Sequence, residues 1–221
     1  MGQDGCVSGD RAWQLVVPIK RAERGKSRLV PPPGVARSHL ARAMACDALS
    51  VAAQVLGGPA VLVVTSDEPM RGYAESLGMS TIADPGGGLN HAVTAGFNAA
   101  AGSGDAAGLV AAPVPALAVL LPDLPALKAS ELENALDLCR ACPVAMVADH
   151  SNTGTCLLTS THGPVLPCFG SRSADRHQEV LGAVPLPVVA PGLRQDVDTA
   201  DDLERALALG LGPFTNALLR R

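Results

Sequence analysis

The chain has 221 residues, which suits one large α/β domain over residues 1–221, with residues 1–10 expected to form a flexible N-terminal tail. Apolar residues make up 48% of the chain and aromatic residues only 2%, so Ala, Val and Leu must build the core. A net charge of -4 gives no basic field for nucleic acid, and no apolar run approaches the ~20 residues that span a membrane. Since residues 1–10 also lack a signal-peptide pattern, we expect a cytoplasmic protein.

The six cysteines do not form a recognisable metal or disulfide framework. Only Cys139 and Cys142 have C-x-x-C spacing, and neither a second pair nor a nearby histidine completes a tetrahedral site. We therefore expect these thiols to be packing residues in a reducing compartment.

The first predicted strand, residues 13–18, leads into a long loop with five cations. Lys20, Lys26 and Arg28 of this loop are candidates to bind an anion such as a triphosphate, and a solvated surface loop is the alternative. The loop is not a P-loop, because that motif needs a glycine where Lys20 stands.

Alternating helices and strands follow. Apolar spacing predicts a helix of about five turns that ends before Gly57, then a strand (61–65), a helix (69–77), a strand (81–83) and a helix (91–101). The consecutive glycines before the last helix, among them Gly87 and Gly88 and followed by Asn90, would let the backbone approach a ligand closely. A plain flexible turn is the alternative, and the spacing does not match a dinucleotide fingerprint.

The most informative strand is residues 118–121, an apolar run that ends at Pro122. It delivers Asp123 to the carboxyl edge of the sheet, where open α/β folds bind ligands. Asp123 is therefore either a helix cap or a metal ligand. We expect Pro125 in the first turn of the next helix, whose buried face carries Leu132, Leu136 and Cys139.

The rest of the chain continues the alternation, with strands at residues 144–148 and 184–189, an antiparallel return at 156–159 and helices at 174–181 and 201–209. Ser173 opens one helix, as an anion-binding residue or as a mere cap. Asp196 and Asp198 stand two residues apart, so in an extended segment both carboxylates point the same way. A divalent cation is the usual reason for such a pair, and a solvated acidic turn is the alternative.

These elements predict a three-layer α/β/α sandwich with a mostly parallel sheet. Hard oxygen ligands without histidine or cysteine favour magnesium over zinc. Magnesium, the cations and the glycine turn together point to a nucleoside triphosphate.

The sequence also resembles a known family over nearly its whole length. Val17-Pro18-Ile19-Lys20 followed by Gly25-Lys26-Ser27-Arg28-Leu29 is similar to the opening of the phospholactate and phosphoenolpyruvate guanylyltransferases of coenzyme F-420 biosynthesis. The family's later motifs occur in order: Gly88-Leu89-Asn90, Leu121-Pro122-Asp123-Leu124-Pro125, Gly154-Thr155, Phe169-Gly170 with Ser173 and His177, and Asp196-Val197-Asp198-Thr199. One departure is Asn152-Thr153-Gly154-Thr155-Cys156, which replaces a more glycine-rich turn.

The resemblance implies a molybdopterin-guanylyltransferase-like fold of the nucleotide-diphospho-sugar-transferase type. It also implies that Mg2+ binds Asp123, Asp196 and Asp198, and that Thr155, Gly170 and Ser173 hold a phosphorylated three-carbon acid. GTP would be the donor, with Lys26 and Asp123 as catalytic residues and phosphoenolpyruvate as the preferred acceptor. The alternatives are 2-phospho-L-lactate, another acceptor such as a sugar phosphate or molybdopterin, or a non-catalytic nucleotide-binding module.

Overall fold

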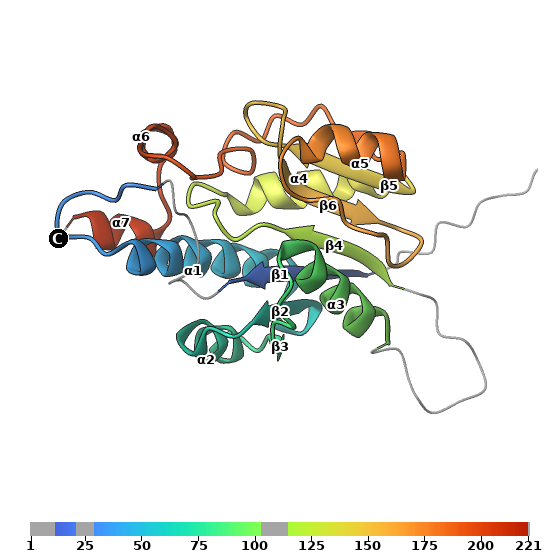
Figure 1. Cartoon of the computed structure of the whole chain (residues 1–221), viewed down its shortest axis with the longest axis horizontal. Helices are drawn as coiled ribbons and strands as arrows, with labels where there is room; N and C mark the ends of the chain where they lie inside the picture. The colour runs from blue at the N-terminus through green and yellow to red at the C-terminus, as the bar shows by residue number, and fades with distance from the viewer. Residues whose placement is uncertain (1–11, 21–28, 103–114, 221) are drawn as a thin grey trace, which may run out of the picture.

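The structure, a computed structural model, describes residues 12–20, 29–102 and 115–220. Its sheet has seven strands in the order β3-β2-β1-β4-β6-β5-β7 (Figure 1). The strands are β1 (Trp13–Ile19), β2 (Val61–Thr65), β3 (Ser80–Ile82), β4 (Ala116–Leu120), β5 (Val144–Ala148), β6 (Thr155–Ser160) and β7 (Val184–Pro185). Neighbours pair in parallel except at β6, which is antiparallel to both β4 and β5. The predicted, mostly parallel sheet with one antiparallel return is confirmed.

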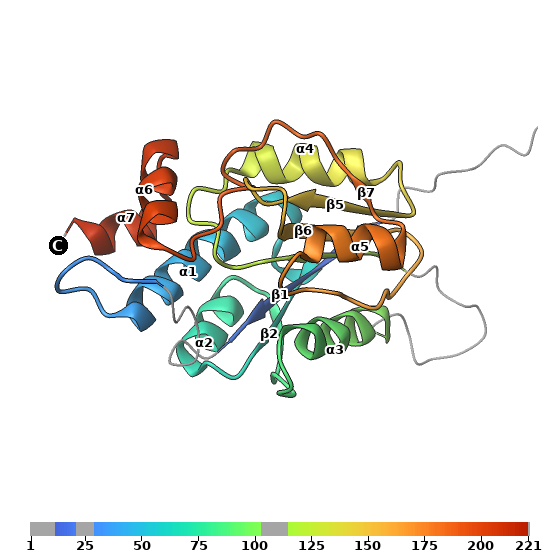
Figure 2. The ribbon, with the colours of Figure 1, turned by 45° about the horizontal axis from the view of Figure 1, so that its top comes forward.

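Helices cover both faces of the sheet and make it the middle of three layers (Figures 1 and 2). One face packs against α1 (Arg37–Leu56), α2 (Glu68–Ser76) and α4 (Ala129–Cys139). The other face packs against α3 (Leu89–Gly102) and α5 (Ser173–Leu181). Helix α3 lies close to the sheet because Gly96 has no side chain: a Cβ there would stand 2.4 Å from a methyl group of Val16. The three-layer α/β/α sandwich is thus confirmed.

A third apolar cluster holds the C-terminal helices α6 (Ala200–Leu209) and α7 (Pro213–Leu219) against α1. Val197 and Leu203 are buried in it beside Met44 of α1. This cluster anchors the segment that carries Asp196 and Asp198 next to the body of the fold.

Two local predictions need correction, and one helix was not predicted. Helix α4 begins at Ala129, so Pro125 lies in a turn before the helix and not in its first turn. The last strand, β7, covers only two residues, because Pro185 and Pro187 lack the N–H groups that a longer ladder needs. Helix α7 was not expected; it is short and begins directly at Pro213.

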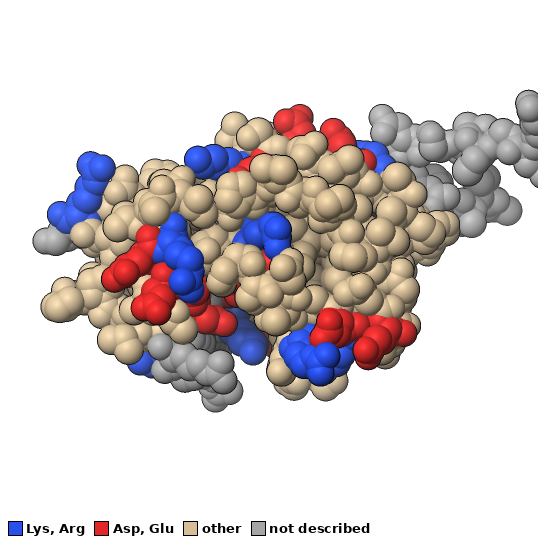
Figure 3. Space-filling model, turned by 90° about the horizontal axis from the view of Figure 1, so that it is seen from above, with Lys and Arg blue, Asp and Glu red and all other residues tan. Residues whose placement is uncertain are grey.

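Charges of opposite sign lie close together on one face of the molecule (Figure 3). On the face shown in Figure 3, acidic and basic side chains lie next to one another in small clusters, and neutral residues separate these clusters. The ion pairs Arg205–Asp202 and Arg172–Asp175 join charges three residues apart. Separately, none of the helices in the described part of the chain has both the length and the apolar character of a membrane span.

Candidate active site at the carboxyl edge of the sheet

A cavity of about 240 Å³ opens where β1 and β4 end. Its wall includes Lys20 directly after β1, Asp123 after β4, and Asp198 from the C-terminal segment. Its other walls come from α1, α2 and the start of α3, through Arg42, Met44, Met70 and Leu89 among others. Residues from opposite ends of the chain therefore meet at the edge of the sheet where the sequence predicted a ligand site.

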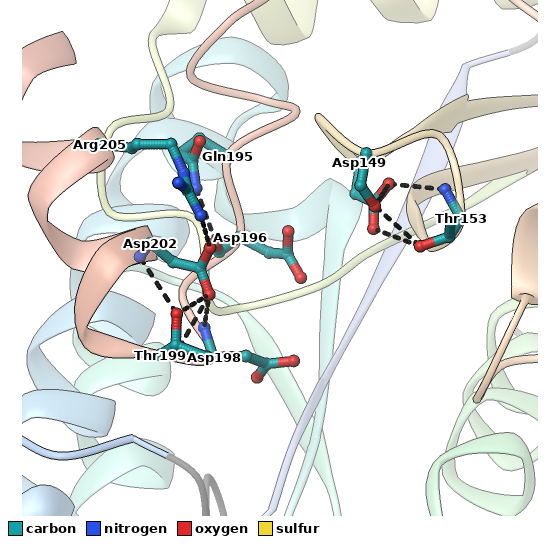
Figure 4. Close-up of polar contacts among 9 residues, drawn as sticks. Asp149, Thr153, Gln195, Asp196, Asp198, Thr199, Asp202 and Arg205 are labelled. Atoms are coloured by element: carbon teal, nitrogen blue, oxygen red, sulfur yellow. Dashed lines mark hydrogen bonds and ion pairs between the residues drawn. The ribbon is translucent and has the colours of Figure 1, made fainter.

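Asp123 and the acidic pair are joined through the backbone. The N–H of Val197 donates to the carbonyl of Asp123 at 3.1 Å. Val197 itself is fully buried, while Asp196 is half-buried and Asp198 exposed. Because side chains alternate in an extended segment, both carboxylates point away from the buried Val197, and Figure 4 shows them directed to the same side. The predicted common orientation of the pair is confirmed.

A capping box fixes this acidic segment at the start of α6. The Thr199 hydroxyl accepts from the N–H of Asp202 at 3.2 Å, and the Asp202 carboxylate accepts from the N–H groups of Thr199 and Asp198 (Figure 4). Burial alone would raise the pKa of Asp202, but hydrogen bonds from Thr199 and Arg205 outweigh it, so the pKa is lowered. Asp202 is therefore an ionised structural group that completes a capping box with Thr199.

A further carboxylate, Asp149, stands across from the acidic pair (Figure 4). Burial raises the pKa of the Cys156 thiol, and the charges of Asp196, Asp123 and Asp149 raise it further, so all three carboxylates lie near the start of β6. Asp149 also accepts from the N–H groups of Thr153 and Gly154, both at 2.9 Å. It therefore organises the turn between β5 and β6.

The chemistry of this donor set fits magnesium. No three His, Cys, Asp or Glu side chains within the described ranges converge into a complete metal cage. Magnesium, however, usually takes one or two protein carboxylates and completes its shell with water and substrate phosphates. Asp123 and Asp198, which line one cavity, offer such a partial set of hard oxygens.

The cations at the cavity differ in how they are held. Lys20 is exposed at the end of β1. The guanidinium of Arg42 instead forms an ion pair with the carboxylate of Asp67, in which Nε donates to Oδ1 at 3.1 Å and Nη2 donates to Oδ2 at 3.0 Å. Lys26 and Arg28, also predicted to bind nucleotide, lie outside the described residues.

The glycine turn before α3 has the backbone freedom expected of it. Gly87 and Gly88 have φ of +77° and +102°, and a Cβ on Gly87 would stand 1.9 Å from the ring of His91. Asn90, two residues on, uses its side-chain amide on Phe169: its Nδ2 donates to the carbonyl at 3.2 Å, and its Oδ1 accepts from the N–H at 2.8 Å. Asn90 therefore ties the glycine turn to the loop before α5.

The predicted acceptor residues lie together at that loop. The Ser173 hydroxyl donates to Thr155 Oγ1 at 3.3 Å, and the N–H of Ser173 donates to the carbonyl of Gly170 at 3.1 Å. Gly170 has φ of +123°, and a Cβ there would stand 3.0 Å from the guanidinium of Arg176. None of the three predicted acceptor residues lines the cavity. The cluster is connected to the cavity wall through the backbone, because Leu121 of that wall donates its N–H to the carbonyl of Cys156, next to Thr155.

Sequence reasoning missed two residues of this region, Arg42 and Asp149, and it assigned no role to His177 of the family motif. Arg42 pairs with Asp67 over 25 positions, which no spacing rule reveals. Asp149 directly follows a predicted strand, as Asp123 does, and that signal could have identified it. The cysteines Cys46 and Cys139 have pKa values raised by burial to about 11, so they remain thiols, as predicted for packing residues.

Comparison with known proteins identifies the family of the chain. Residues 13–177 match the family model described as guanylyl transferase CofC like. The chain is 42% identical to the phosphoenolpyruvate guanylyltransferase of Geodermatophilus obscurus over 216 residues (95% of this chain, 94% of that protein). It is also 42% identical to the protein of that name from Streptomyces scabiei over 213 residues (95% and 96%).

Solved structures show the same fold at low sequence identity. A putative nucleotide-diphospho-sugar transferase from Desulfovibrio desulfuricans G20 aligns with a TM-score of 0.65 at 17% identity, covering 94% of both chains. A 4-diphosphocytidyl-2C-methyl-D-erythritol synthase aligns with a TM-score of 0.60 at 12% identity, covering 90% of this chain and 99% of the other. The chain belongs to the CofC-like guanylyl transferase family and is a nucleotidyltransferase.

Proposed function

We propose that this chain transfers GMP from GTP to the phosphate of phosphoenolpyruvate, giving enolpyruvyl-diphospho-guanosine and pyrophosphate, as a step of coenzyme F-420 biosynthesis. The names of its relatives support the donor and the acceptor. The observation that carries the proposal is the shared cavity: carboxylates for a cation (Asp123, Asp198) and a lysine for phosphate (Lys20) line one wall. A backbone hydrogen bond from Leu121 of the cavity wall to Cys156 connects that cavity to the Thr155–Ser173 cluster.

The residues divide into three groups in this proposal. Lys20, Lys26 and Arg28 neutralise the triphosphate, and Gly87 and Gly88 bring their backbone to the nucleotide, with Asn90 holding that turn in place. Thr155, Gly170 and Ser173 hold the acceptor acid. Asp123, Asp196 and Asp198 hold Mg2+.

The acceptor needs no general base. A phosphate monoester has a second pKa of about 6, so at neutral pH it is already largely a dianion. One of its oxygens attacks the α-phosphorus of GTP, the bond between that phosphorus and the β-bridging oxygen breaks, and pyrophosphate leaves with the electron pair. The lysines and arginine offset the charge of the leaving group. Magnesium, when bound, supplies positive charge that reduces repulsion between donor and acceptor phosphates.

A pyrophosphate-release assay tests the proposal. Purified protein with GTP and Mg2+ should release pyrophosphate when phosphoenolpyruvate is added, and only slowly without an acceptor. Release with 2-phospho-L-lactate and not with phosphoenolpyruvate would contradict the proposed acceptor but would still support guanylyl transfer. If neither acid causes pyrophosphate release, the proposed function is wrong. The chain would then be a nucleotidyltransferase with another acceptor, or a non-catalytic module.

A further inference from the structure

His177 is a buried histidine beneath the proposed acceptor loop, and the mechanism above gives it no role. It lies in α5, and none of its surface is exposed. The ring of Phe169 packs edge-on against it, with ring centres 4.8 Å apart and an angle of 79° between the planes. The orientation of the imidazole is therefore held by packing.

The hydrogen bonds of His177 determine where its proton sits. Nε2 is 3.0 Å from the backbone N–H of Cys168, which can only donate, so Nε2 carries no hydrogen. Burial, with the nearby charge of Arg176, lowers the pKa of His177 to about 4, so the ring is neutral near pH 7. A neutral ring without hydrogen on Nε2 has it on Nδ1. The Nδ1–H therefore donates to Thr155 Oγ1, 2.9 Å away.

This arrangement leaves the Thr155 hydroxyl as a donor. Its oxygen accepts from His177 and from the hydroxyl of Ser173 at 3.3 Å, which occupies both lone pairs. Its own hydrogen points to the sulfur of Met146 at 3.8 Å, which is a weak acceptor. A carboxylate or phosphate oxygen would be a much stronger acceptor for the same hydrogen.

We propose that His177 is a positioning residue that makes Thr155 a hydrogen-bond donor to the acceptor anion. The proposal rests on the proposed function, in which Thr155 holds that anion. His177 does not touch the substrate and moves no proton during transfer. It fixes the direction of a Ser173–Thr155 hydroxyl pair that would otherwise be free to point its hydrogens elsewhere.

Two variants separate the two hydrogen bonds of the ring. In His177→Gln, the longer side chain can place its oxygen near the position of Nε2 and keep the bond from Cys168, but it loses the donor to Thr155. In His177→Asn, the shorter side chain can place its NH2 near the position of Nδ1 and keep the donor to Thr155. We expect His177→Gln to raise the KM for phosphoenolpyruvate about tenfold or more, with the KM for GTP unchanged. We expect His177→Asn to keep the KM for phosphoenolpyruvate within about threefold while lowering the melting temperature.

A double variant tests whether His177 acts through Thr155. Thr155→Val should raise the KM for phosphoenolpyruvate, and adding His177→Gln to it should raise this KM no further. Thr159→Val is the matched control, because Thr159 lies on the same strand, is buried and bonds the carbonyl of Ala145. Equal KM increases in the two His177 variants, fully additive effects with Thr155→Val, or a change in kcat alone would overturn the proposal.

The tautomer is measurable without any substrate. Nitrogen-15 NMR of the imidazole in the free protein should show a single neutral form with hydrogen on Nδ1. Hydrogen on Nε2 would overturn the inference whatever the acceptor is. Wild-type protein with the expected tautomer but no transfer to phosphoenolpyruvate or 2-phospho-L-lactate would contradict the proposed function instead, so the two failures are distinguishable.

Discussion

The acidic side chains around the cavity divide into those that hold the fold and those that face the cavity. Asp202 caps α6, and Asp149 organises the turn between β5 and β6. Asp123 and Asp198 instead line the cavity. The sequence predicted Asp123 because a strand ending in proline delivers it to the sheet edge. It could not predict the His177 tautomer, which depends on the N–H of Cys168 and on packing against Phe169.

The proposed metal site makes a prediction for Asp123. Asp123→Asn keeps the shape of the side chain but removes its charge, so transfer should fall about a hundredfold or more, as expected for several kcal/mol of lost transition-state stabilisation. The kcat for pyrophosphate release at saturating Mg2+ measures this. Asp201→Asn is the control, since Asp201 is exposed in the first turn of α6. Near-normal turnover of Asp123→Asn, with an unchanged melting temperature, would contradict the metal assignment.

Asp196→Ala and Asp198→Ala should also lower kcat. Their effects should not add to that of Asp123→Asn, because one metal cluster would need all three groups. The double variants combine Asp123→Asn with Asp196→Ala or Asp198→Ala. If the fold-losses of kcat in the single variants multiply in the double variant, the three groups do not share one site.

The cation at the end of β1 gives a prediction for nucleotide binding. Lys20→Ala removes a positive charge from the cavity wall, and the KM for GTP should rise about tenfold. Lys128→Ala is the matched control, because Lys128 is exposed before α4 and does not line the cavity. Equal, small effects of the two variants would make Lys20 a solvated surface residue.

The buried His177 predicts a pH dependence of stability. Its pKa is lowered by burial from 6.5 to about 4, so the unfolded chain binds the proton more tightly than the folded chain. The free energy of unfolding should therefore fall as the pH drops from about 6.5 to about 4, by at most ~3 kcal/mol from this group. Urea unfolding at several pH values measures this, and His177→Gln should lose that part of the pH dependence. An identical pH dependence in the variant would contradict a neutral, buried imidazole.

At the scale of elements, long apolar runs were the most predictable part of the chain. The strands at residues 61–65 and 144–148 were predicted with the bounds the structure has, since each is a short, valine-containing run of almost entirely apolar residues. Elements defined by tertiary contacts were not predictable. The start of α4 depends on Glu131, which accepts from the N–H groups of Gly192 and Leu193, a loop 61 residues away.

Helix α7 shows such a long-range dependence and makes a prediction. The carboxylate of Asp47 in α1 accepts from the N–H groups of Phe214 and Thr215, both at 2.9 Å, so it caps α7 from another helix. Asp47→Ala should lower the free energy of unfolding by ~1–3 kcal/mol, because it leaves two N–H groups at a helix start without their acceptor. The urea midpoint measures this, with Glu133→Ala on the exposed face of α4 as the control. A loss no larger than that of the control would show that water replaces the carboxylate.

At the scale of the whole molecule, the fold brings together residues that are far apart in the sequence. Lys20 from the first strand, Asp123 from the middle strand and Asp198 near the C-terminus line one cavity because parallel strands end at one edge. Apolar periodicity predicts that edge, so the general position of the site was predictable. The coupling of the glycine turn to the acceptor loop through Asn90 and Phe169 was not, because a single amide makes it across 79 positions.

The most direct test follows the α-phosphorus of GTP. With GTP labelled at that atom, Mg2+ and phosphoenolpyruvate, the label should appear in a new diphosphate that joins guanosine to enolpyruvate, in equal amount to the pyrophosphate released. Asp123→Asn should form almost none of it. Label recovered only as GMP or GDP, or a product that carries the γ-phosphorus instead, would contradict guanylyl transfer to phosphoenolpyruvate.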